Sequence, residues 1–594
     1  MSREDMGMAD ATGSTTATAG RDRRAGRFDR DHPRYRWVAL SNTTLGMLLA
    51  TVNSSIVIIS LPAIFRGIGL DPLRPANVGY LLWMIMGFLL VSAVLVVPAG
   101  RLGDMFGRVR IYNSGFVIFT AGSIGLSLDP LSGGPGALWL IGWRVVQGVG
   151  GAMLFANSTA ILTDAFPLRQ RGTALGVNQV AAIAGSFLGL LIGGLLSEWH
   201  WRAVFLVSVP IGLAGTVWSY ASLNELGERR RGRLDWPGNV TFALGLGVLL
   251  AAITYGIQPY GGHATGWTNP WVLAGLTGGV ALLAAFCVIE ARVAEPMFHL
   301  TLFRIPQFSA GSLAVLLSAM GRGGLQFMLI IWLQGIWLPL HGFAFEDTPL
   351  WAGIYMLPLT VGFLAAGPVS GYLSDRYGQR LFASGGLLIT AATFLGLLAL
   401  PVDFPYWAFA LLLAVNGVGS GVFSSPNTSR VMSSVPAHQR GAAAGMRGTF
   451  QNSGQALSIG IFFSLLIVGL ATSLPGVLTS SLERAGVPAA AAQAVGHLPP
   501  VGSVFAAFLG YNPVRTLLPP DVLHALPPAA QDRLTGNAFF PTMISGPVHQ
   551  GLVVVFSAAA VMMIVGAAAS MFDGRRSRAG AGTPAAGDAP VVPH

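Results

Sequence analysis

The sequence from Gly100 to Arg110 reads GRLGDMFGRVR, and its spaced pattern returns between Gly371 and Gly378 as GYLSDRYG. Both copies have the form Gly-x-Leu-x-Asp-x-x-Gly, at an offset of 271 residues, and each copy follows a long apolar run. A polar motif that recurs between apolar segments indicates two structurally related halves.

A second pair of segments repeats at nearly the same spacing. Residues 147–150 read QGVG and residues 416–419 read NGVG, an offset of 269 residues. Further along, residues 167–172 and 436–441 share the pattern Pro-x-x-Gln-Arg-Gly. The nearly constant offset predicts that each half contains the same series of six helices.

The composition places these halves in a membrane. The chain has 594 residues, of which 53% are hydrophobic and only 10% charged, with a mean hydropathy of +0.61. Apolar runs long enough to cross a bilayer need roughly 20 residues. We therefore predict an all-α membrane protein with about fourteen transmembrane helices, at 37–61, 77–99, 110–128, 136–161, 172–196, 203–223, 239–256, 270–290, 308–336, 349–370, 381–400, 405–428, 442–471 and 548–571.

These spans divide the chain into five parts. Two pseudo-symmetric six-helix bundles are separated by two inserted helices, and the long loop before the last span has no spanning segment of its own. We expect that loop to form an external cap with short helices, because structureless loops of this length are uncommon. The predicted parts are a disordered cytoplasmic tail at 1–36, an N-terminal bundle at 37–223, the inserted helices and linkers at 224–307, a C-terminal bundle at 308–571 that includes the external loop 472–547, and a disordered cytoplasmic tail at 572–594.

The arginines predict the orientation. All 35 basic residues are arginine and the net charge is +10, but most of them fall in the tails and in alternate loops, such as 101–110, 229–233 and 292–304. This distribution follows the positive-inside rule and argues against nucleic-acid binding. We expect a multi-pass protein of the inner or plasma membrane with both termini in the cytoplasm.

Residues that would support enzyme chemistry are not arranged for it. The histidines are scattered, HExxH, GxSxG and CxxC motifs are absent from the sequence, and Cys287 is the single cysteine. We therefore expect no catalytic residues, no metal and no cofactor.

The segment from Gly100 to Arg110 resembles the signature loop of the major facilitator superfamily. The later motifs resemble its fourteen-helix drug:proton antiporter group (QacA/EmrB-like), over nearly the whole chain from Trp37 to Ser570. The resemblance implies transport by alternating access, with a loop that stabilises one conformation. Its candidate residues are Gly100, Asp104, Gly107, Arg108 and Arg110, with Asp375 in the second copy.

Two further motifs carry the resemblance. Arg144 and Gln147 match the motif of the fourth helix, and an arginine inside a span normally faces a cavity or a partner. The fifth span matches the antiporter motif except that Leu190 replaces its proline, and small residues there permit close helix packing. The matching glycines are Gly176, Gly185, Gly189, Gly193 and Gly194.

The first span departs from the family. The stretch from Asn53 to Pro62 occupies the place of a motif that normally begins with aspartate, and we place every acidic residue in a tail, a loop or the end of a span. By these boundaries the spans contain only two arginines, Arg144 and Arg322. Candidate cavity or coupling residues are Asn53, Trp83, Arg144, Gln147, Arg322, Gln326 and Gln334.

These observations predict a secondary transporter that exports lipophilic or amphiphilic small molecules. Arginine without acid inside the spans favours neutral or anionic substrates over multivalent cations. Proton coupling stays open, because Asn53 cannot carry a proton. Alternatives are a lipid exporter or an uptake permease of the same fold, and more remotely a membrane receptor without transport.

Overall fold

The computed structural model describes residues 34–227, 232–436 and 439–571, and this part of the chain is almost entirely helical. The only strand-type pairing within it is one isolated bridge between Tyr260 and His263. The predicted tails, apart from residues 34–36, and the arginine run 229–231 lie outside the described residues.

The helices of the first half form one series along the chain. They are α1 (Tyr35–Gly67), α2 (Asn77–Phe106), α3 (Arg108–Ser127), α4 (Gly133–Ala165), α5 (Leu168–Trp199), α6 (Ala203–Leu206) and α7 (Ser208–Ser222). Two further helices, α8 (Trp236–Gly256) and α9 (Pro270–Glu290), follow, and a short 3-10 turn η1 (Leu300–Arg304) leads into the second half.

The second half repeats the series with interruptions. Its helices are α10 (Pro306–Trp332), the π-helical turn η2 (Leu333–Trp337), α11 (Leu338–Leu340), α12 (Thr348–Tyr355), α13 (Leu357–Tyr377), α14 (Gln379–Leu398), α15 (Tyr406–Ser434), α16 (Arg440–Ala471) and α23 (Phe539–Met571). Between α16 and α23 lie six short helices: α17 (Leu474–Arg484), α18 (Ala489–Gly496), α19 (Pro500–Phe508), α20 (Val514–Leu517), α21 (Pro520–His524) and α22 (Pro528–Thr535).

The long helices confirm the predicted fold class. Thirteen described helical segments are long and apolar enough to cross a membrane. The helix α3, with 20 residues, packs beside α4 and α7 and completes a set of about fourteen. The packing is pseudo-symmetric, because α1 packs on α5 as α10 packs on α16, and α3 packs on α4 as α14 packs on α15.

The repeated Gly-x-Leu-x-Asp-x-x-Gly segment is helical where we predicted a loop. The helix α2 continues to Phe106 and α13 to Tyr377, so a single glycine separates each helix from the next one. Gly107 and Gly378 have φ values of 111° and 100°. Side chains with a Cβ rarely adopt this conformation, which explains why the final glycine recurs in both copies.

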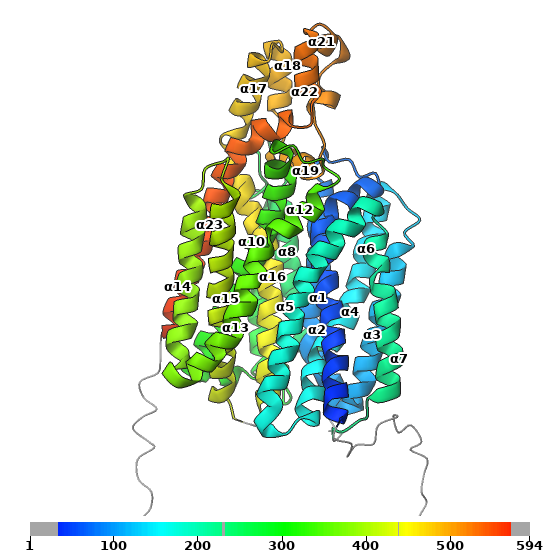
Figure 1. Cartoon of the computed structure of the whole chain (residues 1–594), viewed down its shortest axis with the longest axis vertical. Helices are drawn as coiled ribbons and strands as arrows, with labels where there is room; N and C mark the ends of the chain where they lie inside the picture. The colour runs from blue at the N-terminus through cyan, green and yellow to red at the C-terminus, as the bar shows by residue number, and fades with distance from the viewer. Residues whose placement is uncertain (1–33, 228–231, 437–438, 572–594) are drawn as a thin grey trace, which may run out of the picture.

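The segment between α16 and α23 forms a cap over one end of the bundle (Figure 1). We call α17 to α22 the cap. Every residue of α19 is buried, and the ring of its Phe505 lies 6.0 Å from the ring of Phe65 on α1. The helix α1 begins, and α23 ends, at the opposite end of the bundle (Figure 1). The last span starts at Phe539, earlier than the predicted 548, because α23 extends into the cap side.

Candidate functional site

A buried polar network surrounds Arg144 in the first half. The Arg144 guanidinium donates from Nη1 to Asn53 Oδ1 at 2.6 Å and to Gln147 Oε1 at 2.7 Å. Its Nε donates to the carbonyl oxygen of Met84 at 3.2 Å, and the guanidinium carbon lies 4.4 Å from the centre of the Phe88 ring. Arg144 is fully buried, so these contacts replace water as its solvation.

Two serines extend this network to neighbouring helices. Asn53 donates from Nδ2 to Ser208 Oγ on α7 at 3.1 Å, and Gln147 donates from Nε2 to Ser123 Oγ on α3 at 2.8 Å. The network thereby joins α1, α2, α3, α4 and α7. Amide, carbonyl and aromatic groups, rather than a described carboxylate, stabilise the positive charge of Arg144.

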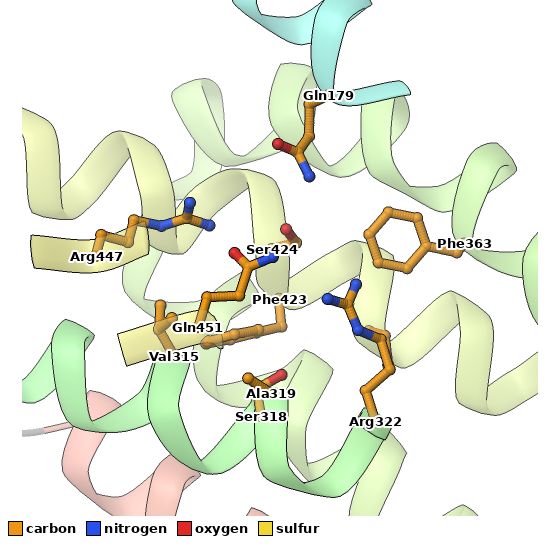
Figure 2. A pocket seen from close by; sticks show the side chains of 11 residues that line it. Gln179, Val315, Ser318, Ala319, Arg322, Phe363, Phe423, Ser424, Arg447 and Gln451 are labelled. Atoms are coloured by element: carbon orange, nitrogen blue, oxygen red, sulfur yellow. The ribbon is translucent and has the colours of Figure 1, made fainter. Parts of the chain in front are cut away.

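A second polar site lies between the two halves (Figure 2). It is a small cavity of about 30 Å³, with room for about two water molecules. Its walls come from α5 of the first half and from α10, α13, α15 and α16 of the second. The lining residues are Gln179, Val315, Ser318, Ala319, Arg322, Phe363, Ser420, Phe423, Ser424, Arg447 and Gln451.

Two arginines face this cavity. Arg322 on α10 and Arg447 on α16 direct their guanidinium groups toward its centre from different walls, and Gln179 points into it from α5 (Figure 2). Arg322 was predicted as a cavity residue, but only two arginines were predicted to lie inside the spans. That count was wrong, because Arg447 lies within α16 and within the predicted span 442–471. The spacing of Arg447 and Gln451, one helical turn apart in an apolar run, was the signal that could have found it.

The two arginine sites differ in the number of acceptors around the guanidinium. Nη2 of Arg144 and Nε of Arg447 are each buried without a hydrogen-bond partner, and no described Asp or Glu lines the cavity. Arg447 experiences the positive charge of Arg322. Like charges in a low-dielectric interior repel strongly, so the two guanidinium groups oppose each other at this cavity.

Contacts between the halves lie beside the cavity and toward the cap. Thr449, which stands between Arg447 and Gln451 on α16, donates from Oγ1 to the carbonyl oxygen of Ala93 on α2 at 3.0 Å. Toward the cap, Gly194 on α5 packs against the backbone of Leu350 on α12. Ligand pockets for drug-sized molecules are roughly 300–1,000 Å³, so a substrate of that size needs more space than this cavity provides.

The glycines of the fifth-helix motif have a packing role in this structure. A Cβ atom at Gly185 or Gly193 would lie 3.1 Å from the carbonyl oxygen of Leu48 or 2.9 Å from that of Ile56, respectively. Gly189 faces Val52 of α1 in the same way, whereas Gly176 has open space beside it. Three of the five predicted glycines therefore allow α1 and α5 to pack closely, and Gly194 brings α5 to the second half.

The predicted switch residues meet at the end of α2 opposite the cap. Arg108 donates from Nε to Asp104 Oδ1 at 2.9 Å and from Nη1 to Asp164 Oδ1 at 2.6 Å. The backbone N–H of Arg108 donates to Glu225 Oε1 at 2.7 Å, which caps the start of α3. Asp164 and Glu225 were not predicted as members of this cluster. The cluster connects α2, α3, α4 and the segment after α7.

The remaining predicted switch residues lie apart from this cluster. Gly100 packs against Ala156 of α4, while Arg110 and Asp375 are exposed. The second copy therefore places its aspartate in a more open setting than the first copy does.

The inserted helices attach to the same end of α2. Arg101 forms an ion pair with Glu295, and the Arg233 backbone N–H donates to Glu295 Oε2 at 2.8 Å. These contacts, first the Arg233 N–H and then the Arg101 charge, lower the pKa of Glu295.

Three predicted cavity residues lie elsewhere. Gln334, in the π-helical turn η2, is fully buried and donates to the carbonyl oxygen of Ile59 on α1 at 3.1 Å, so it bridges the halves near the cap. Trp83 and Gln326 are partly buried and do not line the cavity. Asn53, Arg144 and Gln147 come together, but in the network within the first half.

Curated relatives and solved structures resemble this chain. It is 29% identical over 475 residues to the tetracenomycin C resistance and export protein of Streptomyces glaucescens, covering 79% of this chain and 84% of that protein. It is 28% identical over 457 residues to the methylenomycin A resistance protein of Streptomyces coelicolor, covering 74% of this chain and 91% of that protein. A bacterial homologue of the human lysosomal transporter Spinster matches with a TM-score of 0.55 at 16% identity, covering 91% of this chain and 98% of the other.

The family assignment follows from a family model. The model described as Major Facilitator Superfamily matches residues 43–321 and 237–459, which together cover more than half of the chain. This match confirms the resemblance drawn from the signature motifs, and it confirms a transporter rather than an enzyme. The chain belongs to the Major Facilitator Superfamily of multi-pass membrane transporters.

Proposed function

We propose that this protein exports lipophilic or amphiphilic small molecules across the cell membrane by alternating access. The observation that carries the proposal is the polar cavity between the halves, where Gln179 of the first half faces Arg322 and Arg447 of the second (Figure 2). A site shared by two pseudo-symmetric bundles is exposed to one side or the other as the bundles rock. The names of the two Streptomyces relatives, which refer to resistance and to export, support the outward direction.

We further propose the orientation and the division of the chain. The arginine distribution supports cytoplasmic termini in an inner or plasma membrane, with the cap outside. Tails at 1–36 and 572–594, bundles at 37–223 and 308–571, and inserted helices within 224–307 form the proposed parts. Epitope tags test this arrangement, since a tag at Tyr511 in the cap is expected to react from outside in intact cells.

Substrate charge is the finer part of the proposal. The cavity presents guanidinium and amide donors without a described carboxylate, which supports neutral or anionic substrates. Phe363 and Phe423 offer aromatic surface to the apolar body of such a molecule. The Arg144 network lies within one bundle, where its proposed role is to set the geometry of the first half.

If proton movement drives export, we propose that the groups that carry the proton lie outside the membrane interior. The carriers proposed for a proton-driven cycle are peripheral, namely Asp104, Asp164, Glu198 and His200. The partners of Arg144 support this placement, because they are amides and carbonyls that do not titrate near neutral pH.

Transport by inverted membrane vesicles tests the proposal directly. Vesicles that contain the wild-type protein are expected to accumulate members of a panel of anionic and neutral amphiphiles, with and without an imposed pH gradient. Vesicles prepared from the same cells without the protein are the control for specific transport. Absence of accumulation across the whole panel would contradict an exporter.

A further inference from the structure

Two arginines from two helices face one another across the cavity between the halves (Figure 2). Both side chains are partly buried, and the Nε of Arg447 is enclosed without an acceptor. Among the described residues, neither guanidinium takes part in an ion pair. The cavity therefore concentrates two positive charges in the membrane interior, where charge is costly.

The same protein shows how it stabilises a buried arginine when the purpose is structural. Arg144 has three oxygen acceptors and an aromatic face around it. No described carboxylate lines the cavity around Arg322 and Arg447, and its glutamine NH₂ groups and serine hydroxyls can donate to a ligand as well as accept through their oxygens. Donors converging on two cations are the chemistry that recognises an oxyanion.

We propose that the anionic group of an amphiphilic substrate, a carboxylate, phosphate or sulfonate, binds between Arg322 and Arg447. This inference rests on the proposed export function and names the substrate class of that site. Gln179 supplies a further donor from the first half, so the anion contacts both halves at once. The apolar body of the substrate lies against Phe363 and Phe423 as the cavity widens.

This placement also gives the anion a part in the transport cycle. An oxyanion between Arg322 and Arg447 offsets the repulsion between these two arginines of the second half. Because Gln179 belongs to α5, the same oxyanion attracts the first half toward the second. A ligand shifts a conformational equilibrium only through its different affinity for the two states, and these contacts exist fully only when the halves are closed.

Binding to the full-length protein in lipid nanodiscs tests the inference. Three naphthalene amphiphiles of the same size would be compared, bearing a sulfonate, a neutral sulfonamide or a trimethylammonium group. We expect the sulfonate to bind about tenfold more tightly than the other two, a preference typical of charge-assisted hydrogen bonds. Arg447→Gln and Arg322→Gln are each expected to remove that preference while binding of the sulfonamide persists, which shows that the variants are folded.

Arg484→Gln provides the matched control. Arg484 is an exposed arginine of α17, whose Nε donates to the carbonyl oxygen of Ser480 in its own helix at 3.0 Å. This variant is expected to keep the sulfonate preference. An equal loss of preference in Arg484→Gln, or equal binding of all three amphiphiles to the wild type, would overturn the inference.

Further measurements distinguish an amphiphilic substrate from inorganic phosphate or a lipid as the bound anion. They also distinguish failure of the anion site from failure of the export function. Inorganic phosphate that binds as tightly as the sulfonate, or phosphatidylglycerol in the nanodisc that displaces it, would overturn the amphiphilic substrate as the ligand. Vesicles that transport the sulfonamide as well as the sulfonate, without a charge preference, would leave export intact and refute the anion site. Tight sulfonate binding without transport of any amphiphile would refute export and leave the anion site intact.

Discussion

Arg144 in the first half and the pair Arg322 and Arg447 at the second half are all arginines inside spanning helices, yet their surroundings are opposite. Arg144 donates to Asn53, Gln147 and the carbonyl of Met84. The pair faces a cavity without a described carboxylate. The contrast is between an arginine that donates to three oxygens of the fold, with Nη2 left without a partner, and two arginines that face a cavity.

The two arginine sites also differ in which helices they connect. The Arg144 network links five helices and gives the first half one fixed internal arrangement. The paired arginines lie on α10 and α16 of the second half, and Gln179 of the first half faces them across the cavity. We propose that the first site stabilises a bundle, while the second site responds to what enters the space between the bundles.

Replacing Arg144 gives the largest expected effect on stability. In Arg144→Met, the oxygens of Asn53, Gln147 and Met84 lose their donor, and buried polar groups without partners are costly. We expect the free energy of unfolding to fall by about 3–5 kcal/mol, the range for breaking a buried charged contact. Thermal unfolding of the purified protein measures this change, and an unchanged transition would mean that the network does not stabilise the bundle.

Replacing Arg447 is expected to change stability in the opposite direction. Arg447→Met removes one of two repelling charges and fills similar space with an apolar side chain. Substitutions of this kind stabilise proteins by about 1–4 kcal/mol, so the unfolding temperature is expected to rise while sulfonate binding is lost. A fall as large as that of Arg144→Met would show that the two sites are not different after all.

The cytoplasmic ends proposed for the two halves extend the comparison. Asp104 is held by Arg108, which also binds Asp164, whereas Asp375 of the second copy is exposed. Asp104→Ala is therefore expected to lower initial transport rates about tenfold, the effect of one lost charge-assisted hydrogen bond in a conformational equilibrium. Asp375→Ala is expected to change them by less than about threefold. Equal rates in the two variants at equal expression would contradict this asymmetry.

Much of this asymmetry was not readable from the sequence. The helices and the two halves could be predicted from the apolar runs, the repeated motifs and the recurrent glycines. The length of an apolar run and a positive φ at a glycine depend mainly on residues that are close in the sequence. Contacts between distant residues are not local, and Asn53 and Arg144 are 91 positions apart. Arg447 was left out of the count although it lies inside the predicted span 442–471, and its position beside Arg322 depends on how α16 packs on α10.

Asn53→Asp is expected to change stability least, and it tests whether a carboxylate beside Arg144 makes transport depend on a proton gradient. The new carboxylate would take the position of the Asn53 amide oxygen, 2.6 Å from Arg144 Nη1, so an ion pair replaces a hydrogen bond with a neutral acceptor. The Ser208 hydroxyl, which accepts from Asn53 Nδ2 in the wild type, can rotate to donate to the carboxylate. We expect the variant to fold with a stability within about 1 kcal/mol of the wild type.

Asn416→Asp is the control for placing a carboxylate in a spanning helix without an arginine beside it. Asn416 is a buried asparagine of α15 that donates to Thr393 Oγ1 at 2.8 Å, so its carboxylate would lack the arginine that Asn53→Asp meets. We expect Asn416→Asp to be destabilised, because an uncompensated buried charge is costly. In Asn53→Asp, the rate of export is expected to depend more strongly on an imposed pH gradient than in the wild type, because the pair with Arg144 can exchange a proton as the bundle moves. If the pH dependence of the two proteins is the same in matched vesicles, the Arg144 network stabilises the first half and takes no part in coupling.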